Sequence, residues 1–213
     1  MKTSFITLII TLIALTGFSQ KPEYYQAMGE SLGQYASCKT PEDFQALGNR
    51  FSMIANNEKE EWLPIYYHAH CYIIMSFMEP SDAKKKDSYL DVAEKSLKQL
   101  ETMVPGEAEV FALQAMLYTA RLVVNPMERG QQYSMLIGQS LGRASALDPS
   151  NPRAKLLKIQ NNMGSANHFG KDPKEFCGQA TDLLAGWETY TPKSQLHPAW
   201  GKDQAEELVR SCR

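Results

Sequence analysis

The sequence predicts an all-α fold, because three kinds of pattern agree. Apolar residues recur at three- and four-residue spacing along most of the chain after residue 20, as the buried face of an amphipathic helix requires. A capping side chain precedes proline at Thr40, Asn125 and Asp172, which is typical of helix starts. Sustained apolar–polar alternation and Asn-Gly or Asp-Gly turns are absent from the sequence, so strands are not expected.

The first residues predict a signal peptide. Lys2 gives a basic start, residues 5–15 are apolar except for two threonines, and Gly17-Phe18-Ser19 supplies small residues before a cleavage point at Gln20. This run is too short for a membrane span, which needs about 20 apolar residues. Gln20 is not the cysteine that a lipid anchor would need. We expect residues 1–19 to be removed and residues 20–213 to form a single exported domain, periplasmic or extracellular.

The mature chain is expected to form nine helices. Their predicted spans are residues 22–37, 41–57, 60–79, 83–104, 107–124, 126–147, 151–167, 173–189 and 198–212. The second starts at the Thr40-Pro41 cap and carries the apolar stripe Phe44, Leu47, Phe51, Ile54. The fourth carries the stripe Leu90, Ala93, Leu97, Leu100, Val104.

The later helices are supported in the same way. The fifth is apolar on two sides and must therefore be covered on two sides, which favours an inner position in a stack. Asn125-Pro126 starts the sixth helix, and Asn151-Pro152 is a weaker start for the seventh. The eighth carries the stripe Phe176, Ala180, Leu183, Trp187. The ninth, after His197-Pro198, has one apolar and one charged side, as a closing helix needs.

A repeat organises these helices into pairs. Pro105, Pro149 and Pro192 end three long helices in matching contexts, at spacings of 44 and 43 residues. A fixed period of this size is typical of stacked helix pairs. The expected architecture is therefore an α-solenoid of about four antiparallel helix pairs plus a C-terminal capping helix.

Two segments resemble tetratricopeptide repeats. Residues 144–154, Ala-Ser-Ala-Leu-Asp-Pro-Ser-Asn-Pro-Arg-Ala, look like the end of one repeat running into the next, and residues 108–118 resemble a first helix. The family's period is 34 residues, shorter than the period here, which also suits HEAT-like pairs. The resemblance implies a concave partner-binding surface lined by the first helix of each pair. It places there Tyr67, His70, Met116, Thr119, Gln160 and Met163.

Four cysteines remain after the predicted cleavage. In an exported protein disulfides are permitted, and four cysteines allow three pairings. In the expected stack Cys177, early in the eighth helix, lies near Cys212, at the end of the antiparallel closing helix, so a Cys177–Cys212 disulfide is expected. A bridge between Cys38 and Cys71 is a second suggestion, and four buried free thiols are the alternative.

Chemistry-bearing motifs are sparse. His68, His70 and Cys71 are clustered, and His68 and Cys71 could share one side of a helix. His70 points elsewhere, and no third ligand lies at helical spacing, so no metal and no cofactor are expected. The zinc-protease and phosphate-loop motifs are absent, so we expect no enzyme. A formal charge of −2 gives no basic field for nucleic acid.

Two functions fit these observations. The main prediction is an exported, non-enzymatic scaffold that binds a protein or peptide partner in the periplasm or cell envelope. The alternative is a helical-repeat protein that binds a small molecule or glycan, which an aromatic pocket near Trp62, Tyr66 or Trp200 would favour.

Overall fold

The computed structural model describes residues 22–212, and the predicted signal peptide lies outside this range. Within it the chain forms nine α-helices and no strand, which confirms the all-α class. They are α1 (Pro22–Tyr35), α2 (Pro41–Asn57), α3 (Leu63–Met78), α4 (Ala83–Met103), α5 (Ala108–Val124), α6 (Pro126–Leu147), α7 (Pro152–His168), α8 (Cys177–Thr189) and α9 (Lys202–Ser211). A short 3-10 helix, η1 (Pro173–Phe176), precedes α8.

The predicted caps start the helices as expected. The Thr40 hydroxyl accepts a hydrogen bond from the backbone N–H of Asp43, and the Asp43 carboxylate accepts one from the backbone N–H of Thr40, forming a capping box. Asn125 caps α6 by accepting from Glu128, and Asn151 caps α7 by accepting from Ala154. These side chains satisfy backbone donors that a helix start leaves unpaired.

The third and ninth helices start three and four residues later than predicted. The third begins at Leu63, because residues 58–62 form a turn, and the ninth begins at Lys202, because residues 190–201 form a connection that contains bends and turns. Gly201 has a φ of 105°, and an added Cβ would lie 2.8 Å from the Trp187 ring. Only glycine fits this left-handed turn, so the helix starts after it.

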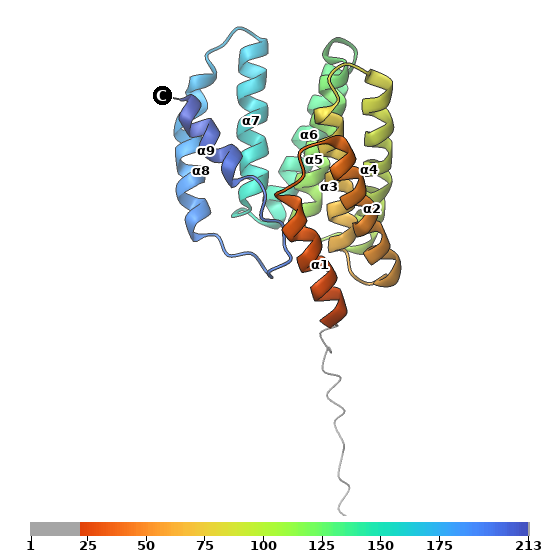
Figure 1. The fold of residues 1–213 in the computed structure, drawn as a ribbon. Helices are drawn as coiled ribbons and strands as arrows, with labels where there is room; N and C mark the ends of the chain where they lie inside the picture. Colours follow the sequence, from red (N-terminus) through yellow and green to blue (C-terminus); the bar gives the residue numbers. More distant parts are fainter. Residues whose placement is uncertain (1–21, 213) are drawn as a thin grey trace, which may run out of the picture.

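Consecutive helices run antiparallel, so α3, α5 and α7 run in the same direction (Figure 1). α3 packs against α2, α4 and α5, and α5 packs against α4, α6 and α7. This is the sequential pairing that the repeat predicted. Figure 1 shows α7, α8 and α9 on one side of the molecule and α1 to α6 on the other.

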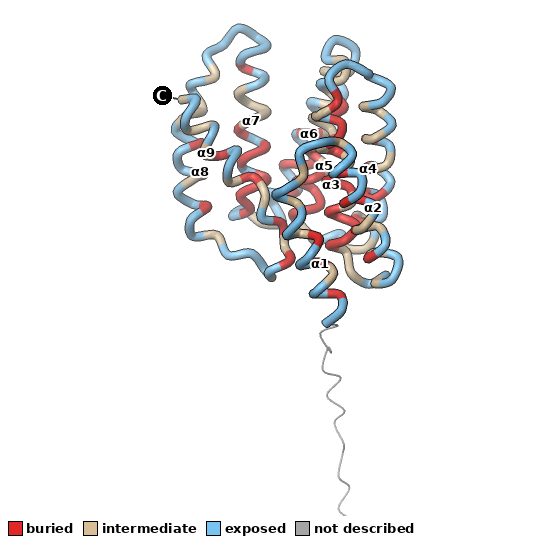
Figure 2. Tube along the Cα trace, viewed as in Figure 1, coloured by how far each residue is buried: buried red, intermediate tan, exposed pale blue. Residues whose placement is uncertain are grey.

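The buried residues form two cores along this division (Figure 2). The larger core lies among α1 to α6 and also takes Ala154 and Leu157 of α7 and Leu196. The smaller joins α7, α8 and α9 through Leu156, Ile159, Ala180, Leu183, Trp187 and Ala205. Trp200 packs against both cores. The connection between α8 and α9 therefore lies where the two parts of the molecule meet.

Candidate functional site

The predicted partner-binding residues fall in rows along the first helices of the pairs. On α3, His70, Ile74 and Phe77 follow at four- and three-residue spacing and so lie on one side of the helix. On α5, Met116, Thr119 and Val123 do the same. With Gln160 and Met163 of α7, these eight residues are called the inner face below.

The inner face is covered at one end and open at the other. The exposed fraction rises along α3 from 2% at His70 to 43% at Phe77, with Ile74 half-buried between them. Along α5 it rises from 5% at Met116 to 46% at Val123. Because α3 and α5 run in the same direction, the open ends of both rows lie at the same edge of the molecule (Figure 1).

The covered end of the inner face is a cluster of aromatic rings. The Trp200 indole stacks on His70, with ring centroids 4.9 Å apart and an interplanar angle of 21°. Tyr35 and Tyr66 also stack against His70, at 5.6 Å and 6.4 Å. Trp200 Nε1 donates a hydrogen bond of 2.9 Å to the Tyr66 hydroxyl. Tyr35, Tyr66, His70 and Trp200 are called the aromatic cluster below.

His70 is a neutral imidazole in this setting. Its Nδ1 is hydrogen-bonded with the Tyr35 hydroxyl, whereas its buried Nε2 has no hydrogen-bond partner in the described chain. Burial lowers the pKa of His70 to about 3, because the charged form would lose its hydration. Burial likewise raises the pKa values of Tyr35 and Tyr66, so both hydroxyls stay protonated at neutral pH.

The residues predicted to line a partner-binding surface have different surroundings. Tyr67 is buried, and its hydroxyl donates a hydrogen bond of 2.9 Å to the carbonyl of Leu196. His70 and Met116 are buried as well. Because all three side chains are buried, a protein partner cannot contact them in this conformation.

The other three predicted residues are half-buried. Thr119 bonds back to the carbonyl of Ala115, which occupies its hydroxyl within α5. Gln160 donates to Gln204 of α9 at 3.4 Å, so the closing helix reaches the inner side of α7. Met163 packs against the smaller core. The open part of the inner face therefore lies mainly on α3 and α5.

A buried ion pair that the sequence did not reveal joins α5 to α7. The Glu109 carboxylate accepts hydrogen bonds from Arg153 Nε at 2.6 Å and from Asn151 Nδ2 at 2.6 Å. Both charged side chains are only 2% exposed. Glu109 sits at an ordinary helix start in the sequence, and Arg153 lies 44 residues later, one repeat away. The pair fixes α7 against the larger body.

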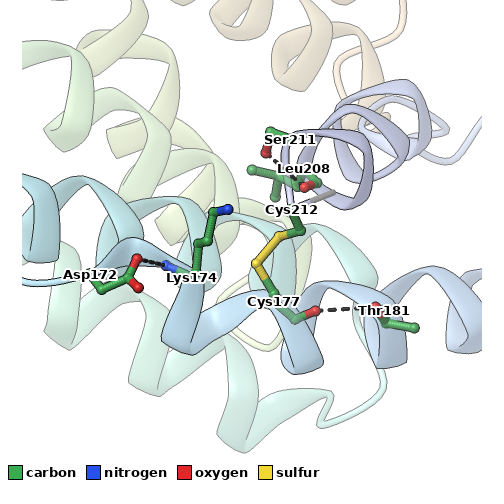
Figure 3. Close-up of a disulfide and its surroundings, with 7 residues drawn as sticks. All are labelled: Asp172, Lys174, Cys177, Thr181, Leu208, Ser211 and Cys212. Atoms are coloured by element: carbon green, nitrogen blue, oxygen red, sulfur yellow. Dashed lines mark hydrogen bonds between the residues drawn. A yellow bond between two sulfur atoms is a disulfide. The ribbon is translucent and has the colours of Figure 1, made fainter.

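Cys177 and Cys212 form a disulfide that ties the start of α8 to the end of α9 (Figure 3). It closes a loop that contains α8, the connection and α9. Cys38 and Cys71 are free thiols, so the second suggested bridge is absent. Burial raises the pKa of the Cys71 thiol, which keeps it protonated and unreactive.

Other candidate features offer less. In the described chain, no three or more His, Cys, Asp or Glu side chains are placed to hold a metal ion. His68 instead forms a hydrogen bond of 2.9 Å with Ser96. A cavity of about 270 Å³ between α7 and α8 is lined by Ile159, Leu183, Lys155 and Lys158, among others. No helix in residues 22–212 has the length and apolar character to cross a bilayer.

Comparison with known proteins gives one informative match. No family model and no curated protein sequence matches the chain. A solved structure described as the HusA haemophore from Porphyromonas gingivalis is 31% identical in sequence and superposes with a TM-score of 0.78. The match covers 89% of this chain and 92% of that chain. The two proteins are therefore alike over nearly their whole length.

Proposed function

This chain belongs to the HusA haemophore family, and we propose that it binds haem and carries it outside the cytoplasm. The observation that carries the proposal is the 31% identity over nearly the full length of both chains. A haemophore is a binding protein and not a catalyst. The chain is accordingly not an enzyme.

The inner face supplies the surface that a porphyrin needs. The macrocycle of haem is a flat apolar plate, and sites for such ligands are mainly apolar, with few polar groups. Ile74, Phe77 and Val123 offer half-buried or exposed apolar side chains on two adjacent helices. The aromatic cluster continues the α3 row with rings that favour stacking on a planar ligand. We assign haem to this face.

The relationship favours the alternative function over the main prediction. A scaffold that binds a protein partner would present Tyr67, His70 and Met116, and all three are buried. A small-molecule protein with an aromatic site near Tyr66 and Trp200 agrees better with the hydrogen bond that joins these two side chains. Protein binding remains a proposal only for a partner that exchanges haem with the chain.

The proposed location agrees with the cysteine chemistry. The Cys177–Cys212 disulfide is the kind of bond that persists in oxidising compartments. The predicted signal peptide would direct the chain to such a compartment. We therefore propose that the protein works in the periplasm or outside the cell.

An absorbance titration tests haem binding. Haem is added to the chain that starts at Gln20, and the change in the Soret band is followed. We expect saturation at one haem per chain. Metal-free protoporphyrin should bind as well, because it has the same apolar plate. Absence of a saturable spectral change with either porphyrin would contradict the proposal.

A pair of variants tests the location. Val123→Glu places a carboxylate on the open end of the inner face, where it opposes the apolar macrocycle and repels the haem propionates. We expect the Kd to rise about tenfold or more, a loss of about 1.4 kcal/mol. Met135→Glu is the control, because Met135 is also exposed, at 59% against 46% for Val123, but lies on α6, on the side opposite the buried Ile137. Equal effects of the two changes would argue against the inner face.

A further inference from the structure

The chain covers part of its own inner face. The connection between α8 and α9, residues 190–201, crosses the start of α3 and holds it through two hydrogen bonds. The Tyr67 hydroxyl donates to the carbonyl of Leu196, and Trp200 Nε1 donates to the Tyr66 hydroxyl. His197 lies edge-on to Trp62, with ring centroids 5.5 Å apart. The covering segment thus comes from the far end of the sequence.

The Trp200 indole is a flat ring that covers part of α3. It stacks on His70, and Ile74 and Phe77 follow His70 along the same side of α3. Beneath it, His70 Nε2 is buried without a hydrogen-bond partner. Leaving a buried polar atom unpaired costs about 1–3 kcal/mol, so such atoms are rare without a reason. A ligand-bound state in which His70 Nε2 gains a hydrogen-bond partner would remove this cost.

The connection lacks the continuous backbone hydrogen bonding of the helices on either side. Within residues 191–200, His197 N donates to Ser194 O, Leu196 N donates to Ser194 Oγ, and the Leu196 carbonyl accepts from the Tyr67 hydroxyl. Leu196 is buried in the larger core, and Lys193 pairs with Glu107 at 2.7 Å. Trp200 itself remains partly exposed and belongs wholly to neither core. The disulfide joins the start of α8 to the end of α9, and the two helices pack on each other, so both flanks of the connection belong to one unit. A movement of the connection away from α3 breaks the Tyr67–Leu196 hydrogen bond.

We propose that Trp200 is a displaceable plug, and that a porphyrin takes its place against His70. This inference rests on the proposed haem function and names the part of the inner face that the ligand uses. When Trp200 leaves, the row of His70, Ile74 and Phe77 becomes continuous along α3. His70 Nε2 then faces the ligand or water and can form the hydrogen bond that it lacks while Trp200 covers it.

Hydrogen–deuterium exchange tests the displacement directly. Peptides that cover residues 191–201 are followed with and without saturating metal-free protoporphyrin, with binding monitored by absorbance. The proposal expects faster exchange in these peptides on binding, because the connection leaves α3. Binding with unchanged or slower exchange there would overturn the plug while leaving haem binding intact. Absence of binding would instead overturn the proposed function.

A variant pair gives an independent readout. Trp200→Ala removes the internal competitor, so the fraction of binding-competent chain rises, and the Kd for protoporphyrin should fall about threefold or more. Phe169→Ala is the control, since Phe169 is 72% exposed at the end of α7, outside the inner face. A Kd that rises in Trp200→Ala would make Trp200 part of the ligand contact and overturn the plug. Thermal melting checks that both variants fold, and the exchange experiment needs no variant.

Discussion

The Glu109 carboxylate is the charged group on which the joint between the two bodies depends. It lies in the interior with Arg153 and Asn151 as donors, and Arg153 Nη2 also reaches the Tyr190 hydroxyl at 3.3 Å. Removing one partner of such a pair is usually costly, because the remaining charge is left buried. The pair therefore links α5 to α7 through buried charges, and loss of either partner should weaken this joint.

His70 should make stability depend on pH. Its pKa is about 3 in the folded chain, against about 6.5 for an unperturbed histidine, and its neighbours Tyr35, Tyr66 and Trp200 carry no charge. Below pH 6.5 His70 binds a proton in the unfolded chain but not in the folded chain, so stability is lost as the pH falls toward 3. The loss is at most about 1.4 kcal/mol per pH unit, or about 2 kcal/mol between pH 6.5 and 5.

Urea unfolding at a series of pH values measures this dependence. His70→Gln keeps a polar group beside the Tyr35 hydroxyl but does not titrate. Its unfolding free energy should fall less steeply than that of the unmodified chain between pH 6.5 and 5. Parallel pH curves for the two proteins would show that His70 is not the group responsible.

Residue chemistry was only partly predictable from the sequence. The sequence placed Cys177 near Cys212, because an antiparallel closing helix brings its end to the start of the preceding one. It also singled out Tyr66 and Trp200 as aromatic candidates. It did not pair Glu109 with Arg153 or Tyr35 with His70, since those partners come from different repeats and carry no local spacing signal.

At the scale of elements, α9 depends on the disulfide. Ala205 is its buried residue, and Leu208 and Val209 pack half-buried against the smaller core, while the opposite side of the helix is exposed. The disulfide supplements this narrow packed side. The Cys177–Cys212 bond, at a sequence separation of 35, restricts the unfolded chain and holds α9 on α8.

Removing both cysteines as Cys177→Ser and Cys212→Ser should lower the unfolding free energy by about 2–4 kcal/mol. Guanidinium unfolding followed by circular dichroism measures the change. Cys38→Ser is the matched control, because Cys38 is a half-buried free thiol. If the double variant were as stable as the control, the disulfide would have no role in holding α9.

Helix starts were predictable where a side chain caps the first turn, as at Thr40, Asn125 and Asn151. They were not predictable where tertiary contacts decide. Pro198 looks like a helix start, yet no helix begins before Gly201, where Trp187 and Leu156 leave no room for a side chain. The predicted start at residue 198 assigned part of this connection to the ninth helix, so the segment that covers the start of α3 was not predicted.

At the scale of the whole molecule, the repeat predicted the pairing of helices but not which surfaces stay open. A solenoid of identical units would leave its inner side free along its full length. Here the C-terminal connection folds back onto the inner face and closes one end, while Phe77 and Val123 remain exposed at the other. This arrangement offers a half-open apolar face, which suits a small planar ligand better than an extended peptide.

A crystal structure of the chain with bound protoporphyrin tests this account most directly. The account predicts the macrocycle on the inner face, over Ile74, Phe77 and Val123, with the Trp200 indole moved away from His70. A porphyrin found in the cavity between α7 and α8, or bound with Trp200 still stacked on His70, would contradict it.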